Sequence, residues 1–366
     1  MLQDKEEQRT PLSEIGEFGL IHRIQNAVRL GNESTLKGIG DDATVLSFDS
    51  EKVVMSTDML TEGVHFNLGY MPLQHLGYKA VTTNLSDICA MNAIPSQILV
   101  SIAVSDRFPV EAVDELYSGI LIACDKYKVD LVGGDTTSSQ AGLVINITAI
   151  GHQKEQDIVY RDGAKNTDLL VVSGDLGAAY FGLQILEREN EVWKANPAVQ
   201  PDLTPYDYLI GRQLKPEARL DIIKLFKKLD IKPTSMIDIS DGLAPETLHL
   251  SEASDVGFVI FEEKIPLDQQ VISAGEEFDV NSSIAALNGG EDYELLFTIP
   301  LADHEKIKGN PNFTIIGHAT PKEEGCYIIG RGNQTKVELT AQGWDAFMAY
   351  KNEVLKAENK KNSEEE

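Results

Sequence analysis

Cysteine is scarce in this chain of 366 residues, which has only Cys89, Cys124 and Cys326, each within an apolar stretch. This pattern is typical of reduced core thiols in a cytoplasmic protein and argues against a disulfide framework or a zinc site. The seven histidines include no HExxH-like pair, which further disfavours a transition-metal site. No window approaches the roughly 18 apolar residues of a membrane span, and the polar first ten residues do not resemble a secretory signal.

Basic residues are few as well: 32 Lys and Arg stand against 58 Asp and Glu, a formal net charge of −26. A surface this negative repels nucleic acid and anionic lipid, so we expect neither as a partner. The hydrophobic share of 42% and charged share of 25% are those of a globular protein long enough for two domains. The chain's last fifteen or so residues carry almost nothing apolar, and residues 348–366 are predicted to form a flexible polar tail.

Short Val- and Ile-rich runs alternate with amphipathic stretches, which indicates an α/β or α+β fold. The strands are expected at 53–56, 97–104, 143–150, 169–173, 236–239, 258–261 and 294–299, and helices at 72–93, 113–127 and 220–229. A domain boundary is expected near 151–163, where polar residues interrupt the apolar pattern. The segment 190–216 is rich in Pro, Asn and charge, and indicates an insertion or a long connection.

Acidic residues recur beside Gly, Ser and Thr, mostly at the expected ends of strands, where ligand sites of open α/β sheets concentrate. A single such aspartate is usually a turn or capping residue, and Asp175 fits that role. Six converging motifs would repel one another unless cations intervened, and their oxygen ligands select Mg2+ or Ca2+. The pattern therefore predicts an acidic site that binds phosphates through Mg2+. The motifs are Gly38–Ala43, Ser56–Asp58, Asn84–Asp87, Gly133–Thr137, Asp238–Gly242 and Gly289–Glu294.

The familiar nucleotide-binding and catalytic motifs do not account for this pattern. The chain has no Gly-Lys dipeptide, which excludes a P-loop. Gly38–Ala43 matches GxGxxA by letter, but no strand is expected before it, and Asp41 and Asp42 would repel a bare pyrophosphate. No Gly-x-Ser-x-Gly or Cys/His arrangement is present, so neither a covalent nucleophile nor a general base is expected.

From about Ser13 to Phe347 the chain resembles the thiamine-monophosphate kinases. Its motifs occur in that family's order: Gly16–Phe18, Gly38–Asp42, Ser56–Asp58, Gly63-Val-His-Phe66, Asn84–Asp87, Gly133–Thr137, Asp238–Gly242 and Gly289–Leu295. Aminoimidazole ribonucleotide synthetase and selenophosphate synthetase, of the same superfamily, share parts of the acidic pattern. The His-Phe element and Gly-Gly-Glu-Asp-Tyr-Glu are the more discriminating signals.

The resemblance implies a two-domain PurM-like fold and a homodimer. Residues 13–150 would form an N-terminal ATP- and Mg2+-binding domain whose sheet joins the partner's in a barrel, and residues 151–347 a second α/β domain. ATP would lie between the domains near the dimer interface. The implied reaction is phosphorylation of thiamine monophosphate to thiamine diphosphate, by direct in-line transfer from ATP assisted by several Mg2+ ions.

The resemblance also implies roles for individual positions. The metal ligands would be Asp42, Ser56, Thr57, Asp58, Asp87, Asp135, Asp238 and Asp241; the nucleotide contacts Gly134, Asp135, Arg161 and Ser240; the substrate contacts His65 and Glu291. One position departs from the family, which can place a Trp near the C-terminus against the thiamine rings. Ala341 stands at that position here, so Trp344, or Phe347, is the candidate for the aromatic contact.

Two alternatives stay open at this point. Another ATP-dependent enzyme of the superfamily would act on an amidine, selenide or carbamoyl substrate; a selenophosphate synthetase would show a reactive cysteine near the N-terminus, whereas the first cysteine is Cys89. The second alternative is a non-catalytic protein that binds divalent metals, although the DxDxDG spacing of an EF-hand is absent.

Overall fold

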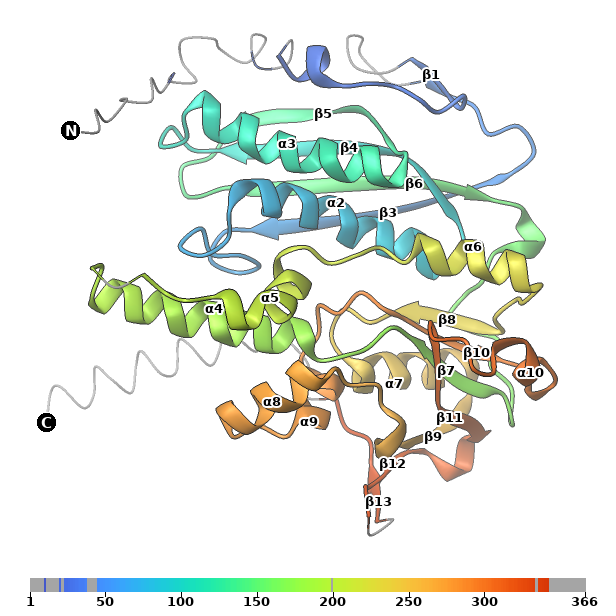
Figure 1. The fold of residues 1–366 in the computed structure, drawn as a ribbon. Coiled ribbons are helices and arrows are strands. Elements are labelled where there is room, and N and C mark those ends of the chain that lie inside the picture. The colour runs from blue at the N-terminus through green and yellow to red at the C-terminus, as the bar shows by residue number, and fades with distance from the viewer. Residues whose placement is uncertain are drawn as a thin grey trace, which may run out of the picture.

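The computed structural model describes residues 10, 20, 23–37, 45–198, 200–332 and 335–341, which form two main sheets with packed helices (Figure 1). The first part contains β1 (Thr35–Lys37), β2 (Val45–Leu46), β3 (Lys52–Thr61), α2 (Leu73–Ala90), β4 (Ile94–Val104), α3 (Val110–Tyr127), β5 (Asp130–Ser138) and β6 (Val144–Gln153). The second contains β7 (Leu169–Ser173), α4 (Ala178–Ala195), α5 (Asp207–Leu214), α6 (Leu220–Leu229), β8 (Ser235–Asp238), α7 (Leu243–Ser254), β9 (Val256–Phe261), α8 (Gln269–Phe278), α9 (Ser282–Asn288), β10 (Leu295–Ile299), α10 (His304–Ile307), β11 (Phe313–Pro321), β12 (Cys326–Ile329) and β13 (Lys336–Glu338).

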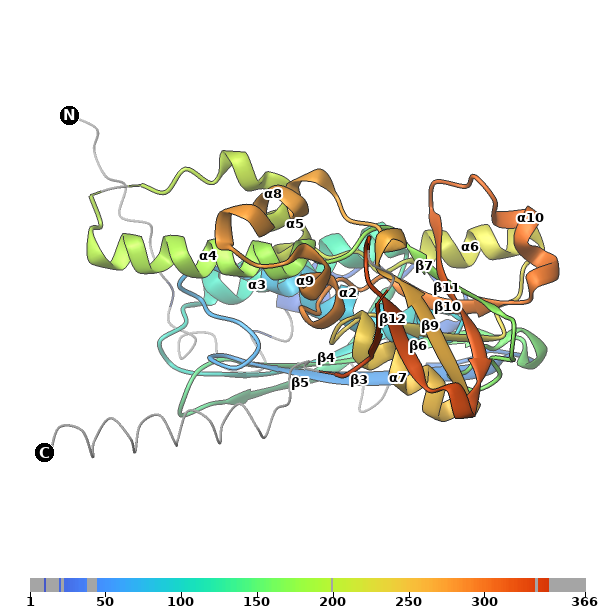
Figure 2. The same ribbon diagram turned by 90° about the horizontal axis from the view of Figure 1, so that it is seen from below.

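The four-stranded sheet has the order β3-β6-β4-β5, with β4 and β5 parallel and the other pairs antiparallel. Helices α2 and α3 lie on one side of it (Figure 2). Leu76, Leu85 and Ile88 of α2 are fully buried, as their spacing of three to four residues predicts. The opposite face is open, because Met55 and Met59 of β3 are 61% and 58% exposed.

The seven-stranded sheet has the order β13-β12-β9-β11-β7-β10-β8, and only its β12–β9 pair is parallel among the described strands. Leu170, Phe258 and Leu296 from three of its strands are fully buried in one apolar cluster. Helix α2 of the first part also contacts α6 and β8 of the second. This contact places the polar residues of α2 next to the carboxyl end of β8.

The strands and helices that the sequence predicts are all present, although the structure contains further elements that are not predicted. The strand expected at 169–173 and the helix stripe at 220–229 coincide with β7 and α6, and the other predicted strands and helices are confirmed within a few residues. Segment 190–216 is not a plain connection, since it contains the end of α4 and all of α5. The boundary expected at residue 150 stays a prediction, and β6 itself continues to Gln153.

Two predictions about strand ends are wrong. The acidic motifs are expected mostly at the ends of strands, but Ser56–Asp58 and Gly133–Thr137 lie inside β3 and β5. The apolar runs end before the strands do, because side chains on the open face of this sheet can be polar. The backbone hydrogen bonds between strands do not depend on the side chains and continue through the polar residues. A glycine is needed at Gly134 because an added Cβ would lie 1.7 Å from the carbonyl oxygen of Val100 on β4.

A third correction concerns the segment before Gly38, where no strand is expected. The structure has the three-residue strand β1 there, paired antiparallel with β2. A strand in a two-stranded antiparallel ribbon is not the parallel βαβ unit of a dinucleotide-binding fold, so the Rossmann interpretation stays disfavoured. Across the described part of the chain, no helix is both long enough and apolar enough to cross a membrane.

Candidate functional site

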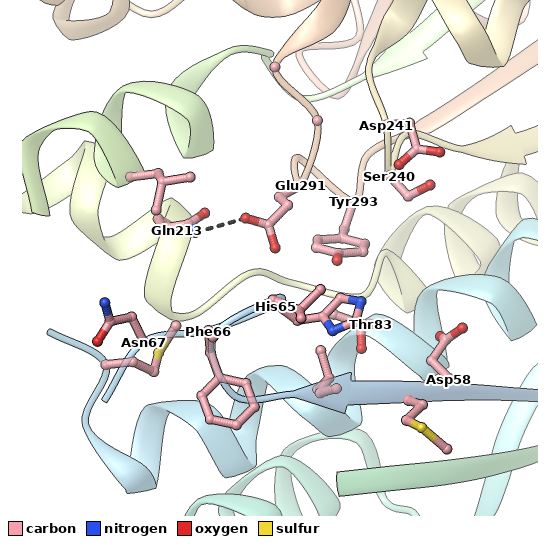
Figure 3. Close-up of a pocket in the computed structure, with 18 of the residues that line it drawn as sticks. Asp58, His65, Phe66, Asn67, Thr83, Gln213, Ser240, Asp241, Glu291 and Tyr293 are labelled. Atoms are coloured by element: carbon pink, nitrogen blue, oxygen red, sulfur yellow. Dashed lines mark hydrogen bonds between the residues drawn. The ribbon is translucent and has the colours of Figure 1, made fainter. Parts of the chain in front are cut away.

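A cavity of about 520 Å³ lies between the two parts of the molecule (Figure 3). The first part contributes β3, the loop that follows it, and α2; the second contributes α4, α5, the loop after β8 and the loop before β10. The polar residues of its wall are Asp58, His65, Asn67, Tyr70, Thr83, Asp87, Glu187, Gln213, Asp238, Ser240, Asp241, Glu291 and Tyr293. Four of the six acidic motifs therefore meet at one cavity.

Asp58 and Asp87 form an acidic pair where β3 faces α2. Ser56 Oγ donates a hydrogen bond to Asp87 Oδ2 at 2.5 Å, and the Asp58 backbone N–H donates to Asn84 Oδ1 at 3.0 Å. Loss of contact with bulk water, together with the charge of Asp87, raises the pKa of Asp58 to about 6. The two carboxylates therefore repel each other and offer a place for a cation.

Asp238 extends this acidic wall from the second part of the molecule. It is the last residue of β8, is 5% exposed, and accepts a 2.7 Å hydrogen bond at Oδ2 from Ser86 Oγ of α2. Burial raises its pKa to about 8, and the charge of Asp87 acts in the same direction. In the absence of a cation, Asp238 is therefore held protonated up to neutral pH.

The shifted pKa of Asp238 predicts how stability depends on pH. Its folded-state pKa of about 8 lies above the roughly 3.9 of an unfolded aspartate, so the folded form holds an extra proton between these values. As the pH rises through this window, the wild type loses the part of its folding stability that comes from this proton. An Asp238→Asn variant has no proton to lose at that position, so its stability lacks this change. We expect the melting temperature of the wild type minus that of the variant to fall from pH 5 to pH 8, measured by calorimetry without divalent cations. A difference that does not change with pH would contradict the shift.

The loop after β8 carries Ser240 and Asp241 at the cavity wall. Glu246 of α7 fixes it, because its Oε1 accepts from Ser240 N at 3.2 Å, Ser240 Oγ at 3.2 Å and Asp241 N at 2.9 Å. Burial raises the pKa of Asp241, while the charge of His249 opposes the shift. The hydroxyl of Ser240 and the carboxyl of Asp241 thus stand on a loop with a fixed backbone.

His65 lies in the turn after β3, and its ring reaches the same space as Glu291 and Tyr293 (Figure 3). The Thr61 backbone N–H donates to His65 Nδ1 at 3.0 Å. Partial removal from water lowers the pKa of His65, with the charge of Glu291 opposing this effect. A neutral imidazole that accepts at Nδ1 carries its proton on Nε2, so His65 can donate a hydrogen bond from that atom.

Glu291 lies on a loop with an unusual backbone. Gly290, Glu291 and Tyr293 have φ of 68°, 59° and 51°, in the left-handed region that costs energy for residues other than glycine. The Glu291 backbone N–H donates to the Ser240 carbonyl oxygen at 2.7 Å. An added Cβ at Gly290 would lie 2.5 Å from that same oxygen, so this close approach requires glycine.

The other acids of this motif face the interior. Asp292 Oδ2 accepts from the Gly177 backbone N–H at 2.8 Å and thus caps α4. Glu294, 1% exposed, pairs with Arg212 at 3.0 Å and also with Arg219. Only Glu291 of the three acids faces the cavity. The sequence predictions do not include these two arginines: Arg212 lies on α5 and Arg219 directly precedes α6, and neither belongs to a motif.

A second cavity, of about 200 Å³, adjoins the acidic wall. Ser56 and Arg161 line it, and Asp87 and Asp238 line both cavities. Burial raises the pKa of Asp87, an effect that the positive charge of Arg161 reduces. The two carboxylates therefore stand between a space with a cationic side chain and a space with His65 and Glu291.

Not every expected site residue reaches this wall. Thr57 follows Ser56 on β3, so its side chain lies on the opposite, open face, where its Oγ1 is 3.0 Å from Thr148 Oγ1. Gly134 and Asp135 are exposed on β5, three strands from β3. Asp42 and the C-terminal candidates Trp344 and Phe347 lie outside the described residues.

The donor set suits a hard divalent cation, since it consists of carboxylates and hydroxyls without thiolate or paired imidazole. Within the described ranges, no three His, Cys, Asp or Glu side chains are grouped closely enough to hold an ion by themselves.

Known proteins share this sequence and fold. The family model "AIR synthase related protein, N-terminal domain" matches residues 40–153. The thiamine-monophosphate kinase of Aquifex aeolicus (strain VF5) is 36% identical over 92% of this chain and 99% of its own length, and that of Bacillus subtilis (strain 168) is 33% identical over 90% and 99%. A solved structure, AaThiL complexed with AMPPCP and TMP, superposes with a TM-score of 0.71 at 34% identity, covering 92% of this chain and 98% of the other. The chain belongs to the thiamine-monophosphate kinase family.

Proposed function

We propose that this protein transfers the terminal phosphoryl group of ATP to thiamine monophosphate and forms thiamine diphosphate. The observation that carries the proposal is that Asp87 and Asp238 line two adjoining cavities, so a donor and an acceptor phosphate can meet at one acidic wall. The names of its relatives support it, as does the solved complex of a relative with AMPPCP and TMP.

The two cavities suit the two substrates differently. The larger one offers Nε2–H of His65 to a phosphate oxygen and the carboxylate of Glu291 to the positively charged thiazolium ring. The smaller one offers Arg161, whose guanidinium can bind phosphate oxygens of ATP. Ser240 adds a hydroxyl at the wall. Trp344 is proposed as the aromatic contact, and Tyr70 lines the described part of the cavity as a second aromatic group.

The obstacle to this reaction is electrostatic. The acceptor phosphate is already ionised near neutral pH, so no general base is needed. Two like charges about 4 Å apart repel by roughly 4 kcal/mol at an effective dielectric constant of 20. Asp58, Asp87, Asp238 and Asp241, with Asp42, would hold Mg2+ ions. Bound Mg2+ would neutralise phosphate charge and align the transfer. The raised pKa values of Asp58 and Asp238 fit a site built for such cations.

We further propose that the enzyme is a cytoplasmic homodimer whose active site is shared between subunits. Strands β3 and β5 are the two edges of the four-stranded sheet, and at about 4.8 Å per strand they stand roughly 14 Å apart. Asp58 and Asp135 of one chain are therefore too distant to bind the same ion. If the edge of β3 pairs with β5 of a second copy and the two sheets close into a barrel, the partner subunit's Asp135 comes to lie on the strand next to Asp58, and the open face with Met55 and Met59 is enclosed.

A substitution at His65 tests the placement of the acceptor. We expect His65→Ala to raise KM for thiamine monophosphate by about tenfold, because a hydrogen bond to a charged phosphate is worth roughly 1.5 kcal/mol or more. The KM for ATP should change little, and steady-state kinetics with each substrate varied in turn would measure both. Equal effects on the two KM values would argue against a role for His65 in acceptor binding.

The proposal as a whole is tested by incubating the purified protein with ATP, Mg2+ and thiamine monophosphate. Mass spectrometry should detect thiamine diphosphate and ADP in equal amounts. ADP without thiamine diphosphate, or no turnover of either substrate, would overturn it. Free thiamine in place of thiamine monophosphate is the control, because an acceptor without a phosphate cannot reach the acidic wall in the same way.

A further inference from the structure

Lys79 is an unexpected residue in the interior of this protein. It lies on α2, whose neighbouring side chains Leu76, Ala80 and Val81 are fully buried, and it is itself only 1% exposed. Lysine is almost never fully buried unless it is paired, because its charged form loses its hydration there. A leucine or methionine at this position would pack against the buried side of α2 as well as a lysine does, so packing alone does not explain the lysine.

The contacts of Lys79 connect the two parts of the molecule. Its Nζ lies 2.7 Å from Glu291 Oε1 and donates to the carbonyl oxygen of Gln213 at 3.1 Å. The side-chain amide of Gln213 in turn donates from Nε2 to Glu291 Oε2 at 2.8 Å, the bond drawn in Figure 3. Both oxygens of Glu291 are thus held, one by α2 and one by α5.

The loop of Glu291 needs such support. Glu291 and Tyr293 both adopt left-handed backbone conformations, which persist only where the surroundings enforce them. A carboxylate has about four lone-pair positions, and Lys79 and Gln213 occupy two of them. The remaining positions are available on the side of the cavity, which Glu291 lines together with His65.

We propose that Lys79 is a positioning residue for substrate binding: from the interior of α2 it fixes the Glu291 carboxylate at the cavity wall, toward the cationic ring of the substrate. The inference rests on the proposed function, in which Glu291 faces the thiazolium ring. Lys79 touches neither substrate. It acts through Glu291 and joins α2 of the first part of the molecule to the Glu291 loop of the second part.

The test compares Lys79→Met with the wild type in steady-state kinetics. We expect KM for thiamine monophosphate to rise by about 10- to 100-fold, the usual effect of removing a group that orients a site, with KM for ATP within about twofold. Lys79→Arg keeps a cation and should recover part of the affinity. Lys126→Met is the matched control, since Lys126 pairs with Glu217 between α3 and the segment after α5 but does not line the cavity. It should leave both KM values unchanged.

A double variant separates positioning from a merely structural role. Lys79→Met removes the cationic partner of Glu291 and should lower the melting temperature, whereas Lys79→Met/Glu291→Met removes both charges and should regain stability. The KM for thiamine monophosphate should stay raised in the double variant although the fold is recovered. If that KM returns to the wild-type value, or if the single variant changes neither KM selectively, the positioning role is wrong. A wild-type protein without activity would instead refute the proposed function.

Discussion

Replacing Asp58 by asparagine should lower turnover at least about 100-fold, beyond the 10- to 100-fold typical of groups that only support a metal site. Asp58 stands on β3 with its carboxylate beside that of Asp87, at the cavity wall. The neutral amide keeps the shape of the side chain but is a much weaker ligand for a hard cation. The measurement is kcat with both substrates and Mg2+ saturating.

The same variant should fold at least as well as the wild type. The pKa of Asp58 is raised to about 6, so at pH 8 the wild type carries a charge there that the folded state disfavours. Without divalent cations at pH 8, the melting temperature of Asp58→Asn should therefore equal or exceed that of the wild type. Asp106→Asn, at an exposed position of the β4–α3 connection, is the control for removal of one negative charge. Near-wild-type turnover at saturating Mg2+ would remove Asp58 from the site.

Mixing two inactive variants should restore activity. Asp58→Asn and Asp135→Asn each remove one proposed ligand of a site shared between subunits, so each homodimer should be nearly inactive. A heterodimer of the two contains one site with both substitutions and one site with neither. After random reassociation about half of the dimers are mixed, so about a quarter of the wild-type activity should return.

The result distinguishes two arrangements of the acidic residues. If Asp58 and Asp135 served the same site within one chain, every site in the mixture would carry one substitution and no activity would return. The separation of β3 and β5 by two intervening strands is the reason to expect recovery. Denaturing and refolding the variants together, with each variant refolded alone as the control, supplies the reassociation that the experiment needs.

The fold class was predictable from local pattern. Strand β7 and helix α6 coincide with their predicted ranges. A short continuous apolar run follows from burial of both faces of a strand, and a spacing of three to four residues follows from burial of one side of a helix. The prediction was wrong where β3 and β5 continue through polar residues. A strand edge or an open face lets polar side chains remain in the ladder, and a single sequence does not show which face is open.

The site was predictable in its chemistry but not in its arrangement. Asp58, Asp87, Asp238, Asp241, His65 and Glu291 all line the larger cavity. Thr57 resembles them in sequence context but lies on the open face of the sheet, and Asp135 lies on β5, at the other edge of the sheet from Asp58. The alternation of side chains along β3 places Thr57 on the face away from the cavity. The distance between the two edge strands keeps Asp135 away from the cavity of its own chain.

The sequence by itself determined that acidic residues recur beside Gly and Ser and that their oxygen atoms suit hard cations, since charge and ligand chemistry are properties of residue types. Only the tertiary structure decided that the acids of Gly289–Glu294 divide, with Glu291 toward the cavity and Glu294 toward buried arginines. It alone also brought Lys79 to Glu291, 212 positions later in the chain. Contacts between residues so far apart depend on how helices and sheets pack, and no local pattern records them.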